Sequence, residues 1–169
     1  MGKSLETIKG SVWALFLTTH AVLVERIEER LAQAGFPPLA WYDVLWALER
    51  ATDRRVRMSE LAERVVLSRS NLTRLVDRLE DARLVSRERS EVDKRGAYAV
   101  LTERGKTMRR QMWPVYQAAI RDLFEKAVTD DEAETMGSAL RRILDAARQR
   151  QDAESVLLTN AGEKRLGKV

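Results

Sequence analysis

A helical segment with a basic outer face, residues 68–79, carries the clearest chemistry in this 169-residue sequence. Its leucine and valine side chains recur at the spacing of one helix face, which predicts an amphipathic helix. With Ser68 as the expected N-cap, the first N–H groups of this helix suit contacts with phosphates and base edges. The helix opens with Ser68, Arg69, Ser70 and Asn71, and its other face holds Arg69, Ser70, Thr73, Arg74, Asp77 and Arg78. These residue types favour binding to a nucleic acid.

A basic helix face is most often only solvated, so the neighbouring segments decide between the two interpretations. Residues 60–65 predict a short helix, with Ser59 as its expected N-cap. The separation between this helix and the basic one is that of a helix-turn-helix, in which the second helix enters the major groove. The pair therefore favours DNA binding over simple solvation.

After Leu84 the spacing of apolar residues changes from helical to alternating, which is typical of a β-strand. Residues 90–96 predict a turn and residues 97–101 a returning strand. A two-stranded ribbon this short is marginal alone, so it must pack against helices. The ribbon adds the basic side chains Arg87, Arg89, Lys94 and Arg95. The sequence thus predicts a mainly α fold with a small β wing, a winged helix-turn-helix.

Further helices must support this unit from both ends of the chain. Helical spacing predicts a first helix over residues 5–32, ended by Gly35, and a second over residues 40–51. Together with helices after residue 102, they carry more apolar surface than a small winged-helix core needs, which favours a dimer. We expect residues 1–38 to form an N-terminal dimerisation helix and linker, 39–102 the DNA-binding region, 103–150 C-terminal dimerisation helices and 151–169 a C-terminal tail.

The boundaries of the last two helices are marked by polar residues. Thr102 is the expected N-cap of a fifth helix that runs to about Val128. Thr129 and Glu132 have the spacing of a capping box and open a sixth helix. Its periodicity fades past Gln151, where we expect the tail to begin.

Composition excludes several classes of function. The absence of cysteine removes disulfides and thiolate metal sites, and a single histidine, His20, leaves no catalytic triad. Asp130 and Asp131 suggest a metal site less well than they suggest the start of a helix. We therefore expect no enzyme activity, no cofactor and no metal.

The net charge is small, +4 from 30 basic and 26 acidic residues, so any nucleic-acid binding depends on where the charge is clustered. No apolar run is long enough to span a bilayer, and the first residues lack the apolar core of a signal peptide. We expect a cytoplasmic protein without a membrane partner.

Several motifs in their order along the chain resemble the signature of the MarR (multiple antibiotic resistance regulator) family. They are residues 72–80 (LTRLVDRLE), 84–85 (LV), 93–95 (DKR) and 101–105 (LTERG). One departure is Arg83, where the family usually has a glycine that allows a left-handed turn after the helix. An arginine must either adopt that conformation at a cost of about 1 kcal/mol or end the helix differently.

The resemblance implies a homodimeric winged-helix regulator that binds double-stranded DNA at an inverted-repeat operator. The helix of residues 68–79 would enter the major groove. Arg95 of the wing would enter the adjacent minor groove, with Asp93 orienting it. The DNA-binding residues implied are Ser68, Arg69, Ser70, Asn71, Thr73, Arg74, Arg78, Arg87, Asp93, Lys94 and Arg95.

Aromatic side chains near the expected junction of the DNA-binding and dimerisation parts suit a small aromatic or anionic effector. The sequence offers Trp13, His20, Trp41, Tyr42, Trp46, Trp113 and Tyr116, of which Trp13, His20, Trp46 and Trp113 are the candidates. The alternative is that they are core and interface residues, because tryptophan is mostly buried, and His20 fits an interface better than a ligand or metal site.

We therefore expect a transcription regulator, a repressor released by a small ligand. The alternatives are a constitutive DNA-binding regulator without an effector and a winged-helix module that binds an acidic protein partner.

Overall fold

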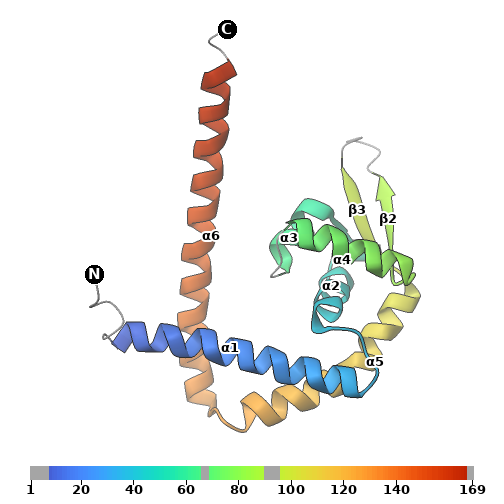
Figure 1. Cartoon of the computed structure of the whole chain (residues 1–169), viewed down its shortest axis with the longest axis vertical. Coiled ribbons are helices and arrows are strands. Elements are labelled where there is room, and N and C mark those ends of the chain that lie inside the picture. The colour runs from blue at the N-terminus through green and yellow to red at the C-terminus, as the bar shows by residue number, and fades with distance from the viewer. Residues whose placement is uncertain (1–7, 66–68, 90–95, 167–169) are drawn as a thin grey trace. The chain divides into compact units, whose positions relative to one another are not determined.

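A computed structural model of the chain describes residues 8–65, 69–89 and 96–166. The chain divides after Leu123 into two compact units. The first unit is mainly helical with a small antiparallel sheet, and the second contains one long helix (Figure 1). The predicted fold class, a winged helix-turn-helix with further helices before and after it, is confirmed.

The elements follow one another along the chain as a helical scaffold interrupted once by the wing. The helices are α1 (Ile8–Gln33), α2 (Leu39–Glu49), α3 (Met58–Arg64), α4 (Arg69–Asp81), α5 (Glu103–Ile120) and α6 (Asp130–Leu166). The strands are β1 (Arg55–Arg57), β2 (Val85–Arg89) and β3 (Ala97–Leu101). Two short helical turns complete the list, η1 (Thr52–Arg54) and η2 (Arg121–Glu125).

The core of the DNA-binding region is built around the apolar side of α4. Leu72, Leu75, Val76 and Leu79 follow the i, i+3, i+4, i+7 spacing and are at most 2% exposed. They pack with buried side chains of α2, α3 and all three strands. Because each of these leucines fills a closed core, replacing one with alanine should cost about 2–5 kcal/mol.

The sheet has the order β1–β3–β2, so the wing's second strand lies in the middle. Val56, Ala99 and Arg87 are aligned across the three strands and share one face. Arg57, Tyr98 and Glu88 are aligned at the neighbouring position and share the other face. Val56 and Ala99 are buried, so the first face covers the core and the second is the outer face.

A second apolar cluster joins α1, α2 and α5. It contains Leu31, Leu39, Tyr42 and Met112, with Ile27, Phe36 and Val115 packed against it. This cluster attaches the DNA-binding region to the helices that precede and follow it.

Three predicted helix boundaries are confirmed. Gly35 ends α1 with a φ of 76°, in the left-handed region that glycine enters readily. The Thr102 hydroxyl caps α5 by accepting a hydrogen bond from the Gly105 N–H at 3.0 Å. Thr129 and Glu132 form the capping box at the start of α6, where the Thr129 N–H donates to Glu132 at 2.9 Å.

Four expectations about the elements were wrong. Residues 55–57, where no strand was expected, form strand β1, which pairs with β3. Helix α3 begins at Met58 directly after this strand, and Ser59 lies inside it rather than capping it. Helix α5 ends at Ile120 and continues as a π-helical turn, not as an α-helix to Val128. Helix α6 does not fade at Gln151 but continues to Leu166.

Candidate nucleic-acid interface

The outer face of α4 presents polar and basic side chains to solvent. Asn71, Thr73, Arg74 and Arg78 are exposed, while the opposite side of the helix is closed by the core. Arg69 and Ser70 begin the helix, but their side chains, like all of Ser68, lie outside the described part of the structure. The amphipathic pattern seen in the sequence thus separates the four exposed residues from the core.

Arg87 of β2 faces α4 rather than open solvent. Its guanidinium approaches Asp77 at 2.5 Å and Glu80 at 3.5 Å, and it donates a hydrogen bond to the Thr73 carbonyl oxygen at 3.4 Å. The backbone N–H of Arg87 also donates to Glu80, at 3.1 Å. These contacts join the middle of the wing strand to the helix expected in the groove.

The outer face of the sheet carries two arginines around one tyrosine, a feature that the sequence did not reveal. The guanidinium carbon of Arg55 lies 4.1 Å from the centre of the Tyr98 ring, and that of Arg57 lies 5.4 Å from it. The Arg57 guanidinium also donates to the Tyr98 hydroxyl at 3.0 Å, and Arg55 approaches Glu88 at 3.7 Å. The Arg-Val-Arg alternation was the available signal, but three residues are too few to read as a strand.

Arg83 adopts the left-handed conformation that the family usually assigns to glycine. Its φ is 60°, its N–H donates to the Glu80 carbonyl at 2.8 Å, and the Leu84 N–H donates to the Leu79 carbonyl at 2.9 Å. This pair of bonds is the Schellman motif, which closes the end of a helix. The chain therefore passes from α4 into β2 through the usual turn.

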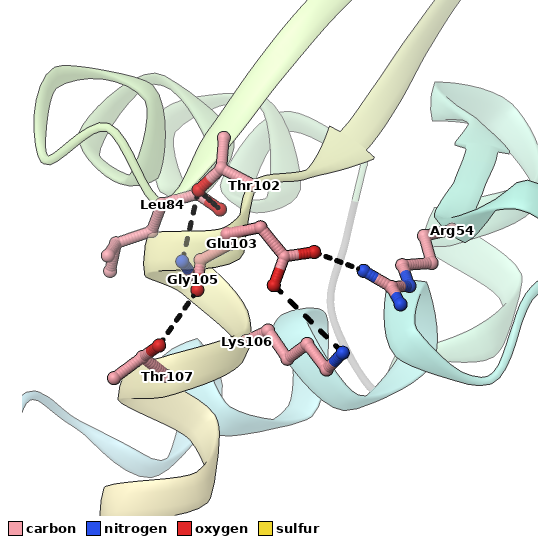
Figure 2. A network of polar contacts seen from close by, with 7 residues as sticks. All are labelled: Arg54, Leu84, Thr102, Glu103, Gly105, Lys106 and Thr107. Carbon is pink, nitrogen blue, oxygen red and sulfur yellow. Dashed lines mark hydrogen bonds and ion pairs between the residues drawn. The ribbon is translucent and has the colours of Figure 1, made fainter.

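A polar network fixes the other end of the wing where β3 passes into α5 (Figure 2). The Thr102 N–H and hydroxyl both lie within hydrogen-bond distance of the Leu84 carbonyl oxygen, at 3.2 and 3.0 Å. A Cβ atom on Gly105 would lie 2.1 Å from this same oxygen, so only glycine fits there. Glu103 pairs with Arg54 at 2.5 Å and thereby also ties α5 to the segment before β1.

The tip of the wing, with the predicted contacts Asp93, Lys94 and Arg95, lies outside the described residues. Strands β2 and β3 lead to it and are paired up to Arg89 and Ala97.

The structure brings together two of the four residues predicted to bind an effector. Trp46 of α2 and Trp113 of α5 both stack on Tyr42, at centroid distances of 6.4 and 6.1 Å, and are 39% and 37% exposed. Tyr116 packs edge-on against Tyr42 at 5.0 Å. Trp13 instead contacts Phe16 on the exposed side of α1, where His20 is also exposed.

An open pocket of about 510 Å³ lies between the end of α1 and the C-terminal half of α5. It is lined by Arg30, Gln33, Ala34, Pro114, Val115 and Ala118. None of the four predicted effector residues lines it.

Charged groups cluster around α2, and the sequence did not single them out. Glu49 of α2 and Arg109 of α5 form a largely buried ion pair, and the Arg109 guanidinium lies 5.0 Å from the Trp46 ring centre. Asp43 is exposed as a residue, yet nearby protein atoms desolvate its carboxyl group, and together with the Glu28 carboxylate they raise the pKa of Asp43 to about 6.

The described residues contain neither a candidate metal site nor a candidate membrane-spanning helix. No group of three or more histidine, cysteine, aspartate or glutamate side chains there could hold a metal ion. No helix in the same residues is both long and apolar enough to cross a membrane.

Comparison with known proteins adds to this geometry. A model of the MarR family matches residues 34–96. The chain is 28% identical over 130 residues to the HTH-type transcriptional regulator SarZ of Staphylococcus epidermidis. This match covers 77% of this chain and 84% of SarZ.

Two solved structures from Streptomyces coelicolor are similar throughout most of their length. AbsC, a MarR family transcriptional regulator, matches with a TM-score of 0.77 and 31% identity over 85% of this chain and 97% of AbsC. Sco3205, a MarR family transcriptional regulator solved in complex with DNA, matches with a TM-score of 0.77 and 29% identity over 83% of this chain and 88% of Sco3205.

Proposed function

The chain belongs to the MarR family of DNA-binding transcription regulators and is not an enzyme. We propose that it is a homodimeric repressor that binds an inverted-repeat operator. A small aromatic or anionic ligand releases it from DNA. In this proposal the protein acts in the cytoplasm, where it binds chromosomal DNA. The observation that carries the proposal is the exposed polar face of α4, with Arg74 and Arg78, attached to a wing.

Residues 39–102 form the DNA-binding region in this proposal. Helix α4 lies in the major groove, where Asn71, Thr73 and Arg74 reach base edges or phosphates. Ser68, Arg69, Ser70 and Arg78 add contacts along the same helix. The wing reaches the neighbouring minor groove with Lys94 and Arg95, oriented by Asp93.

Dimerisation is assigned to residues 1–38 and 103–150, with residues 151–169 as a C-terminal segment. It is supported by exposed apolar side chains on both α1 and α6. On α6, Met136, Leu140, Ile143 and Leu144 follow helical spacing, and each is at least 39% exposed. On α1 the same holds for Ile8, Val12, Leu15 and Phe16. Apolar surfaces of this kind are typical of an interface.

The dimer can be tested by changing the apolar face of α6. Leu140→Glu with Ile143→Glu should convert a dimer into a monomer in sedimentation, because four charges would be buried across a two-fold axis. Arg141→Glu, which changes the charge of the same helix away from that face, should leave the dimer intact. A wild-type protein that sediments as a monomer would contradict the assignment.

The effector site is supported by the aromatic cluster around Tyr42. Trp46 and Trp113 belong to α2 and α5, so a ligand between them would act on the junction between DNA-binding and dimerisation parts. A ligand shifts the spacing of two recognition helices only if it binds the two states with different affinities. Trp13 and His20 remain the more distant candidates on α1.

The operator is tested by selecting duplexes from a random pool with the full chain. The proposal expects an inverted repeat with half-sites about ten base pairs apart, since a two-fold dimer presents two copies of α4 one helical turn apart. No enrichment, or an asymmetric single site, would contradict it.

The effector is tested by a thermal-shift screen of phenolic and carboxylate compounds, followed by operator release. A compound that raises the melting temperature should release the wild-type protein from the selected duplex and act less well on Trp113→Ala. If no stabilising compound releases DNA, the regulator is constitutive.

A further inference from the structure

We propose that Arg87 is a positioning residue that fixes the angle between the recognition helix α4 and the wing, rather than a residue that contacts DNA. This role rests on the DNA binding proposed above. It assigns a purpose to Asp77 and Glu80, two of the three carboxylates of α4.

The guanidinium of Arg87 is already occupied by α4. It faces Asp77 at 2.5 Å and Glu80 at 3.5 Å, and it reaches the Thr73 carbonyl oxygen at 3.4 Å. Its side chain is 30% exposed. The planar fork of an arginine can hold several acceptors at once, which an ammonium group cannot do in the same way.

The charge balance of this group disfavours a phosphate partner. Two carboxylates face one guanidinium, so Asp77, Glu80 and Arg87 together carry one negative charge. A phosphate brought to Arg87 would have to displace these carboxylates and would be repelled by them. Arg87 therefore serves the interface through α4.

The position of Arg87 explains what the contacts fix. The wing strand β2 is joined to α4 covalently through the turn at Arg83 and Leu84. One attachment alone would act as a hinge. Arg87 lies in the middle of β2, opposite Ala99, and gives a second attachment further along the strand. Two attachments set the direction in which β2 and β3 lead to the wing tip.

The test measures operator affinity of the full chain by fluorescence anisotropy, using the duplex selected from the random pool. The variants are Arg87→Ala, Asp77→Asn and the double variant. Asp77→Asn discriminates most sharply, because removing a negative charge near DNA should strengthen binding unless that charge positions the wing. Arg89→Ala removes the same charge from the same face of β2, and no ion pair of Arg89 occurs among the described residues, so it is the matched control.

We expect Arg87→Ala and Asp77→Asn each to weaken binding about fivefold, and the double variant to be no weaker than either single one. A second duplex has the base pairs replaced at which the wing is proposed to enter the minor groove. Arg87→Ala and Asp77→Asn should each reduce the preference of the protein for the selected duplex over this second one. A simple loss of stability would lower the active fraction for both duplexes equally and leave that preference unchanged. Thermal unfolding of each variant identifies any that do not fold, and Asp77→Asn carries the test if Arg87→Ala is one of them.

The inference is overturned if Asp77→Asn binds more tightly than the wild type, if the two losses add, or if Arg87→Ala behaves as Arg89→Ala does. In each of these cases the wild-type protein still binds its selected duplex, so the proposed function stands. If the wild type selects no duplex, both fail together.

Discussion

Arg83 forms the turn that leads from α4 into the wing strand β2. Its φ of 60° lies in the left-handed region, which costs a side-chain-bearing residue about 1 kcal/mol. The Schellman bonds to Glu80 and Leu79 hold it there. An arginine here could adopt the left-handed conformation or end the helix differently. The chain adopts the left-handed conformation, so the turn from α4 into the wing is the one that a glycine would form.

Replacing Arg83 with glycine should therefore stabilise the protein. We expect the free energy of unfolding to rise by about 0.5–1 kcal/mol in chemical denaturation, because glycine adopts this φ without strain. Arg78→Gly, in the helical interior of α4, should instead lose about 1 kcal/mol. A loss of stability in Arg83→Gly would show that the arginine side chain contributes more than its strained backbone costs.

Asp43 should make stability depend on pH. Its folded-state pKa of about 6 lies above the ordinary value of 3.8, so the folded protein keeps a proton that the unfolded chain has lost. The contribution of the Asp43 carboxyl group to the free energy of unfolding is complete below about pH 4 and is lost as the pH rises through about 6.

Asp43→Asn should consequently raise the melting temperature at pH 7.5 but not at pH 4. Between these pH values the melting temperature of the variant should depend less on pH than that of the wild type. Thermal unfolding across this range checks it, with Glu134→Gln of α6 as a control for loss of an exposed carboxylate. Equal effects at both pH values would contradict the assigned pKa.

At the scale of elements, α2 and α5 are joined by the ion pair of Glu49 and Arg109 beneath Trp46. Arg109→Met should destabilise the protein by about 3 kcal/mol, because it leaves the Glu49 carboxylate largely buried without its partner. The double variant with Glu49→Met should recover most of that loss, as measured by denaturation. Equal instability of the single and double variants would show that packing, rather than charge, is lost.

The elements that the sequence predicted well are those with a long apolar face or a defined cap. Helix α4 was readable because Leu72, Leu75, Val76 and Leu79 alternate with polar residues at helical spacing. Helix α5 was readable at its start because Thr102 has a hydroxyl that can cap it. Such signals are local, and the sequence contains them in full.

The elements that were missed depend on contacts between distant segments. Strand β1 is three residues long and exists because β3 offers it a free edge. The start of α3 is set by that strand rather than by Ser59. Helix α6 was expected to end near Gln151 because apolar spacing fades there, yet the following residues include no proline and many good helix formers.

The candidate site was predictable in the same uneven way. The exposed polar face of α4 was apparent from residue types alone. The position of Arg87 was not, because a strand pattern does not say which carboxylates of a neighbouring helix its side chains will meet. Likewise, spacing along the chain does not show that Trp46 and Trp113 share Tyr42 while Trp13 and His20 lie elsewhere.

At the scale of the whole molecule, a small net charge of +4 must act through its placement. Arg74 and Arg78 lie on the exposed face of α4, while α1 and α6 carry exposed apolar side chains that the proposed dimer would cover. In the proposed complex the protein neutralises several phosphates at once, and each binding event releases counterions.

The salt dependence of binding to the selected duplex tests this central claim most directly. For the full chain, the logarithm of the association constant should fall linearly with the logarithm of salt concentration, with a slope near −0.9 for each neutralised phosphate. Arg74→Ala should reduce the slope by about one such unit, and a scrambled duplex should bind at least about a thousandfold more weakly. A flat salt dependence, or equal affinity for the selected and scrambled duplexes, would contradict the account.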